Sequence, residues 1–152
     1  MDRKPTYEEL EKKFRLIADY THSWEYWIGR DSKLHYISPS CRNHTGYTQQ
    51  EFIEIENLFF DIIHPGDRDL IYNHIHHETN APKVESLEFR IVDRGGCTRW
   101  ISHTCQPVYD ENGDFLGRRA SNWDITDRKL AEKERDESTR KLKETSAFLN
   151  TV

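Results

Sequence analysis

The 152-residue sequence lacks a long apolar run, a cysteine framework and a block of positive charge. Without about 20 consecutive apolar residues there is no candidate transmembrane helix, and the charged N-terminus does not resemble a signal peptide. Cys41, Cys97 and Cys105 are the only cysteines and form no CxxC pair, which argues against disulfides and a structural zinc site. We therefore expect a cytoplasmic protein with no direct membrane insertion and no metal site.

The sequence also lacks catalytic motifs and the cluster of basic residues that binds nucleic acid. There is no P-loop, no GxSxG, no HExxH and no convincing pair of carboxylates, so no catalytic residue is expected. The net charge is −5, and the basic residues near the C-terminus alternate with acidic ones. Binding to nucleic acid needs a concentrated basic surface. We predict that the chain is not an enzyme and has no nucleic-acid partner.

The composition divides the chain into three segments. Residues 1–20 are predicted to form an amphipathic helix, because Thr6 and Glu9 form a capping box and apolar residues recur at helical spacing. Residues 21–126 contain the aromatic and β-branched residues of a folded core. Residues 127–152 are predicted to form a charged linker helix, since 13 of the 18 residues in 127–144 are charged. The apolar stripe of the first helix consists of Tyr7, Leu10, Phe14 and Ile17.

The middle segment is predicted to contain strands, then helices, then strands. A second capping box, Thr48 with Glu51, begins one of the helices. Tight turns join the last three strands, which are therefore predicted to be antiparallel neighbours. This order predicts an α+β domain with one five-stranded antiparallel sheet and helices on one face. Strands are expected over 24–28, 34–38, 84–92, 98–109 and 115–125, and helices over 40–45, 48–55 and 67–79.

Several motifs in this order resemble the PAS domain family over roughly residues 17–129. They are Tyr36-Ile-Ser-Pro-Ser40, Thr45-Gly46-Tyr47, His64-Pro-Gly-Asp-Arg68, Glu88-Phe-Arg90, Arg99-Trp100-Ile101, Pro107-Val108, Asn112-Gly113 and Asp124-Ile-Thr126. The resemblance implies a PAS core with its PAC-type C-terminal half. It leaves the function open, because this fold serves in ligand sensing, dimerisation and protein docking.

The function expected from the resemblance is sensory input and dimerisation for a two-component histidine kinase, with the effector domain in the same polypeptide. The alternatives are the PAS domain of a cyclic-dinucleotide enzyme, a ligand-free interaction module and a haem-based sensor. A homodimer is expected because the apolar stripe of the first helix needs a partner surface. In such proteins Asp124, Ile125 and Thr126 form the joint that relays a signal, and Asp124 and Thr126 are both able to cap the following helix.

Polar residues on the predicted strands could line a pocket for a small organic ligand; a core filled by side chains is the alternative. Helical spacing places His74 inward, His76 on the polar side and His77 at the boundary. A hydrogen-bonded core histidine is preferred to a haem ligand here, and Cys41 lies at the wrong place for a flavin photosensor, so haem and flavin are both disfavoured. The pocket candidates are Tyr26, Tyr36, His74, Arg90, Trp100, His103 and Asn122.

Overall fold

The computed structural model describes residues 3–78 and 83–151, without the side chains of 76–78. The side chains of His76 and His77 therefore lie outside the described residues. The elements in chain order are α1 (Tyr7–Asp19), β1 (Trp24–Gly29), β2 (Leu34–Ile37), α2 (Cys41–Thr45), α3 (Gln49–Glu54), α4 (Leu58–Asp61), the 3-10 turn η1 (Pro65–Asp67), α5 (Arg68–Glu78), β3 (Glu85–Val92), β4 (Thr98–Tyr109), β5 (Phe115–Asp124) and α6 (Thr126–Asn150).

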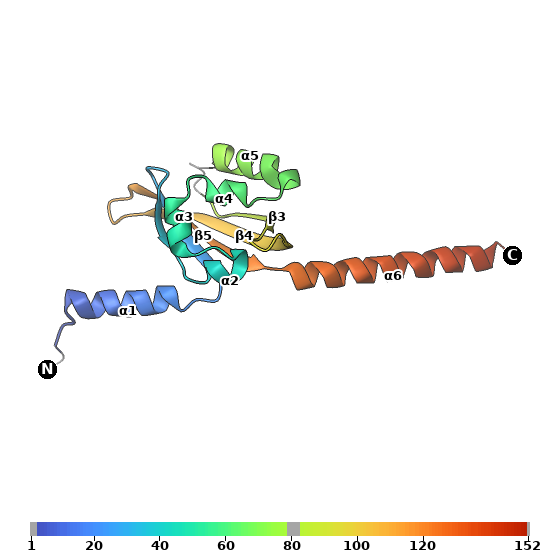
Figure 1. Ribbon diagram of the computed structural model, residues 1–152, viewed down its shortest axis with the longest axis horizontal. Coiled ribbons are helices and arrows are strands. Elements are labelled where there is room, and N and C mark those ends of the chain that lie inside the picture. The colour runs from blue at the N-terminus through green and yellow to red at the C-terminus, as the bar shows by residue number, and fades with distance from the viewer. Residues whose placement is uncertain (1–2, 79–82, 152) are drawn as a thin grey trace.

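One five-stranded antiparallel sheet organises the chain, in the order β2-β1-β5-β4-β3. The connection from β2 to β3 carries α2 to α5, which cover one face of the sheet (Figure 1). The helix α1 stands apart from this layer, and α6 extends away from the domain. The predicted α+β architecture is confirmed. Among the described residues, no helix is long and apolar enough to cross a membrane.

The hairpin turns follow the local chemistry of the sequence. Between β3 and β4, Asp93 Oδ1 accepts the backbone N–H of Cys97, and Gly96 takes a left-handed φ of 84°. Between β4 and β5, Asp110 Oδ1 accepts the backbone N–H of Asp114, and Gly113 has a φ of 81°. Because these turns fix the register, each strand directs alternate side chains toward the helices.

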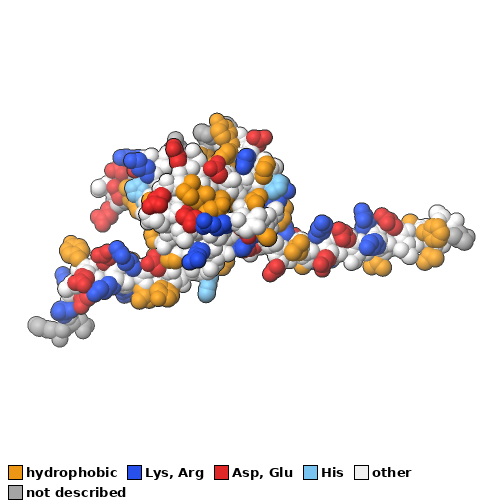
Figure 2. Space-filling model, viewed as in Figure 1, with side chains coloured by type: hydrophobic (Ala, Val, Ile, Leu, Met, Phe, Trp, Pro, Cys, Tyr) orange, Lys and Arg blue, Asp and Glu red, His pale blue; other side chains and the backbone are white. Residues whose placement is uncertain are grey.

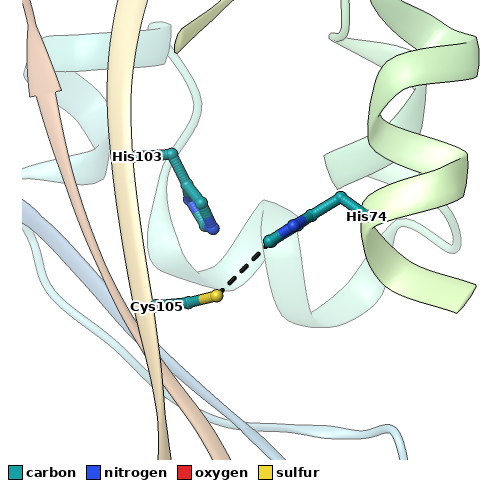
Figure 3. A group of neighbouring side chains, drawn as sticks. All are labelled: His74, His103 and Cys105. Atoms are coloured by element: carbon teal, nitrogen blue, oxygen red, sulfur yellow. Dashed lines mark hydrogen bonds between the residues drawn. The ribbon is translucent and has the colours of Figure 1, made fainter. Parts of the chain in front are cut away.

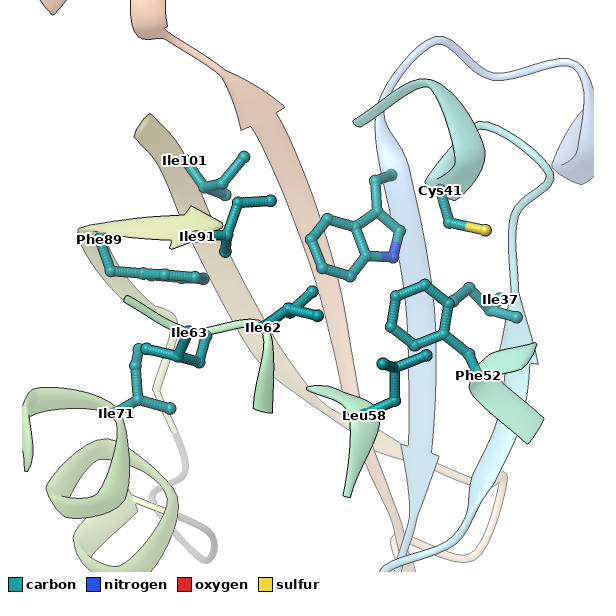
Figure 4. Packing of buried hydrophobic residues seen from close by; sticks show 11 residues of the cluster. Ile37, Cys41, Phe52, Leu58, Ile62, Ile63, Ile71, Phe89, Ile91 and Ile101 are labelled. Atoms are coloured by element: carbon teal, nitrogen blue, oxygen red, sulfur yellow. The ribbon is translucent and has the colours of Figure 1, made fainter. Parts of the chain in front are cut away.

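The hydrophobic core fills the space between the sheet and the helical layer (Figure 4). Phe89, Ile91 and Ile101 come from the sheet, and Ile91 and Ile101 are completely buried. Each such side chain contributes about 1.5–3 kcal/mol when it leaves water. The buried cluster consists of Trp24, Ile37, Cys41, Phe52, Leu58, Ile62, Ile63, Ile71, Phe89, Ile91 and Ile101.

The two predicted capping boxes have different outcomes. At α1, Thr6 Oγ1 accepts the N–H of Glu9, and the Glu9 carboxylate accepts the N–H of Thr6. At α3, Thr48 Oγ1 accepts the N–H of Glu51, but the Glu51 carboxylate pairs with Arg94 at 2.7 Å. The second box was therefore only half right, because a tertiary ion pair takes its acid. No residue of α1 is buried, so this helix lies outside the core as expected.

Candidate functional site

A polar cluster lies on the helix-facing side of the sheet, inside the apolar core. Asn122 on β5 is opposite Trp24 on β1 and His103 on β4, so these residues share one face. Asn122 is completely buried and His103 is 4% exposed. The helix α5 places His74 over the same region, where its ring lies 5.2 Å from the ring of His103. His74 thus points inward, as helical spacing predicted.

Hydrogen bonds fix the orientation of this cluster. The Asn122 amide nitrogen donates to the backbone oxygen of Trp24 at 3.0 Å, so its oxygen must face His103. That oxygen lies 2.7 Å from His103 Nδ1. Since an amide oxygen only accepts, Nδ1 of His103 carries the proton and donates it. Burial lowers the pKa of His103 to about 4, so the ring is neutral near neutral pH.

Cys105 joins the cluster two residues after His103 on β4. Its sulfur lies 3.4 Å from His74 Nε2, and Figure 3 shows the three side chains converging from β4 and α5. Arg118 on β5 also donates to the Cys105 sulfur at 3.4 Å. Sequence reasoning missed Cys105. The signal that could have found it is the His-x-Cys spacing, which places both side chains on one face of a strand.

Aromatic rings pack beside the polar cluster. The ring of Tyr26 lies 4.9 Å from that of Phe59 and 6.3 Å from that of His103. Trp24 and Phe52 complete the group, with Phe52 4.6 Å from Phe59. Burial raises the pKa of Tyr26 well above its ordinary value, so its hydroxyl stays protonated. These rings pack within and against the hydrophobic core beside His103.

Three of the seven pocket candidates lie elsewhere, so the seven do not form one pocket. Tyr36 lies on the opposite face of the sheet, where its hydroxyl donates to Asp19 at 3.0 Å. Arg90 forms a two-pronged pair with Asp67 at 2.8 and 2.9 Å, which lowers the pKa of Asp67. Trp100 lies under Arg90, whose guanidinium carbon is 5.4 Å from the ring centroid. Residues two positions apart on a strand share a face, whereas neighbouring residues face opposite sides. Trp100 is three positions from His103 and pairs with Arg90, so both lie on the other face of the sheet.

A shallow groove runs between α1 and the face of the sheet that the other helices leave open. Phe14 and Ile17 form one side, and Glu25 and Ser121 form part of the other. The carboxylate of Glu25 accepts a hydrogen bond from Ser121 at 2.7 Å. The remaining lining residues are Ala18, Thr21, Thr104, Gln106 and Arg119. This surface, which we call the α1 groove, combines apolar helix residues with polar sheet residues.

The joint between β5 and α6 is tied to the sheet. The Thr126 hydroxyl oxygen accepts the backbone N–H of Trp100 at 3.0 Å, and the N–H of Ile125 donates to the Trp100 oxygen at 2.9 Å. Asp124 Oδ1 accepts the backbone N–H of Thr126 at 2.9 Å. Ile125 occupies the N-cap position. The expectation that Thr126 caps the helix was wrong, because its hydroxyl instead links α6 to β4.

A second tie holds the first turn of α6. Glu88 on β3 pairs with Arg128 at 2.7 Å and with Lys129 at 2.5 Å. The Lys129 ammonium also lies 4.9 Å from the centre of the Trp100 ring. The start of α6 therefore contacts two adjacent strands, whereas the helix from Lys133 to Asn150 is exposed along its length.

One antiparallel sheet with helices over one face and a helix leaving its last strand defines a class of small α+β domains. The chain belongs to the PAS fold family, whose sequence pattern matches residues 34–118. This is the family that the motif order indicated.

Comparison with known proteins agrees with this assignment. The chain is 28% identical over 137 residues to the uncharacterized protein y4lL of Sinorhizobium fredii, which covers 88% of the chain and 16% of that protein. It is 32% identical over 95 residues to a blue-light-activated histidine kinase of Brucella ovis, covering 62% of the chain and 18% of the kinase. The chain thus spans less than a fifth of the length of either relative.

Among solved structures, a sensory box histidine kinase/response regulator from Burkholderia thailandensis superposes with a TM-score of 0.65 at 24% identity. The match covers 87% of this chain and 98% of that one. At this identity the likeness concerns the fold alone.

Proposed function

We propose that the chain is the sensory input and dimerisation module of a multidomain signalling protein, with a histidine kinase effector in the same polypeptide. The three segments 1–20, 21–126 and 127–152 would then be a dimerisation helix, a PAS core and a signalling linker. The observation that carries the proposal is the hydrogen-bonded joint that couples the sheet to α6. Similarity to part of a much longer histidine kinase supports the choice of effector.

The route from the core to the joint is short. His103 pairs with Asn122 across β4 and β5, and the next pair on the same face of these strands is buried Ile101 with Asp124, which lies at the exposed end of β5. A ligand or contact that displaces His103 or Asn122 would therefore move the strand ends that hold α6. Allosteric couplings are typically only about 1–3 kcal/mol, which a few hydrogen bonds can supply.

Dimerisation through α1 would complete the module. Phe14 and Ile17 are 67% and 65% exposed, and Tyr7 is 94% exposed. Figure 2 shows apolar side chains along α1 and mixed charges along α6. Burying the stripe of Tyr7, Leu10, Phe14 and Ile17 against a second copy would remove this apolar surface from water. We expect a parallel homodimer, in which the two α6 helices form a weak and adjustable coiled coil.

The charged surface of α6 fits an adjustable contact. One heptad register places Leu142 and Leu149 at inward positions late in the helix but Arg128 and Arg135 at the equivalent positions early in it. Charged residues at the first inward positions oppose tight packing of two α6 helices against each other. A small energy gap between two arrangements is what a signalling switch needs.

The test uses the full-length parent protein and measures autophosphorylation. We expect Asp124→Ala to change the activity about fivefold or more, the lower end of typical couplings, with little change in melting temperature. The matched control is Asp127→Ala, which also removes an acid from the start of α6. This variant keeps the Asp124 carboxylate, which holds Thr126 in the position where its hydroxyl accepts the N–H of Trp100. Equal activities for the two variants would count against relay through the joint. A gene encoding another effector after Val152 would overturn the kinase assignment.

A further inference from the structure

The side chains of His74, His103 and Cys105 bring three metal-ligand atoms together. One ligand atom from each residue lies within 4.8 Å of those of the other two. His103 and Cys105 are both buried and project from the same face of β4, and His74 approaches them from α5 (Figure 3). Two imidazoles and a thiol from one strand and one helix form a ligand set that the sequence alone did not reveal.

The second observation is the unpartnered nitrogen of His103. Because Nδ1 donates to Asn122, Nε2 carries a lone pair and is the acceptor of the ring. Within the described part of the chain, this Nε2 is buried and has no hydrogen-bond partner. A buried acceptor without a partner costs free energy and calls for a physical explanation. A ligand held in the cluster would provide the missing partner.

We propose that His74, His103 and Cys105 bind a thiophilic transition-metal ion, with copper(I) preferred. Thiolate and imidazole ligands select soft or borderline ions such as Cu(I) and Zn(II). Hard ions such as Ca²⁺ and Mg²⁺ need oxygen ligands, and among the side chains that the structure describes no carboxylate belongs to the cluster. Asn122 would act as the supporting residue, because a ligating histidine commonly donates its other N–H to a carbonyl oxygen.

Charge favours the monovalent ion. With Cys105 as a thiolate and both imidazoles neutral, Cu(I) gives a site of zero net charge, whereas Zn(II) leaves one positive charge. The Arg118 guanidinium already places one positive charge against the sulfur, so a further positive charge on the metal complex would add to it. Glu85 faces Cys105 across the β3–β4 pair, but its carboxylate lies 3.5 Å from the Lys83 ammonium. An uncompensated charge in a buried site is expensive, so the neutral complex is preferred.

Metal binding would link α5 to the sheet. His103 and Cys105 are on β4, whose residue Trp100 contacts the joint to α6. An ion held between β4 and α5 would restrain both elements. The binding itself is a property of this chain, and it does not depend on which effector follows or on whether the joint transmits a signal.

The test titrates the reduced, chelator-treated 152-residue chain with Cu(I), without oxygen, against a chromophoric copper chelator. A Cys97→Ser background removes the exposed thiol. We expect one ion per chain. Cys105→Ser and His74→Gln should each weaken binding at least about tenfold, because changes to supporting residues alone cost 10–100-fold. The matched control is Cys41→Ser, which alters another buried thiol outside the cluster and should bind as the parent does.

Circular dichroism of each variant separates loss of binding from loss of folding, and half-buried His74 is a less disruptive position than His103. X-ray absorption of the loaded protein should show one sulfur and two nitrogen ligands. A parallel titration with Zn(II) tests the charge argument, which would be overturned by tight zinc binding without copper binding. The site itself would be overturned by the absence of stoichiometric binding of either ion, or by equal affinity in the Cys105→Ser variant and its parent.

Discussion

The hydrogen bond between His103 and Asn122 allows a quantitative test of the orientation of these two side chains. Replacing Asn122 by Leu keeps a similar volume but leaves the Nδ1–H of His103 without its partner. It also removes the side-chain hydrogen bond to the backbone oxygen of Trp24, which contributes about 0.5–1.5 kcal/mol. Each buried group left unsatisfied costs about 1–3 kcal/mol. Asn122 is completely buried, so water cannot replace the lost contacts. We expect Asn122→Leu to lower the free energy of unfolding by about 3 kcal/mol.

A double-mutant cycle isolates the contact. In a His103→Phe background the Nδ1–H is already gone, so Asn122→Leu should cost about 1–2 kcal/mol less than in the parent chain. The measurement is urea unfolding followed by tryptophan fluorescence, with a chelator present to exclude metal effects. The control is Asn73→Leu on the exposed side of α5, which should change the stability by less than about 0.5 kcal/mol. A coupling energy near zero would refute the assigned orientation of Asn122 and the proton position on His103.

Two further predictions concern association and thiol chemistry. Phe14→Asp places a charge in the apolar stripe of α1 and should convert a homodimer into a monomer, as measured by light scattering; a parent chain that is monomeric at high micromolar concentration would contradict this. Burial raises the pKa of the Cys41 thiol to about 11, so thiolate forms only in strong alkali and alkylation should be slow at neutral pH. Exposed Cys97 should react first when modified positions are mapped by mass spectrometry, and faster labelling of Cys41 would refute the packing around α2.

The sequence determined most of the fold because its signals are local. Hairpin turns at Asp93–Gly96 and Asp110–Gly113 fix the antiparallel neighbours, and the capping box at Thr6 begins α1. Alternation in 84–92 directs Phe89 and Ile91 inward. These features depend on residues a few positions apart, so they can be read before the chain is folded.

Tertiary structure decided which polar residues meet, because those contacts join distant parts of the chain. Glu51 fits a local capping box but pairs with Arg94, 43 residues away. Thr126 is a natural helix cap, yet its hydroxyl accepts the N–H of Trp100 from β4. The sequence pointed His74 inward, but only the packing of α5 on β4 placed it beside Cys105, 31 residues later. The packing of helices and loops against the sheet sets these distances, and the pattern of residues around each position does not fix that packing.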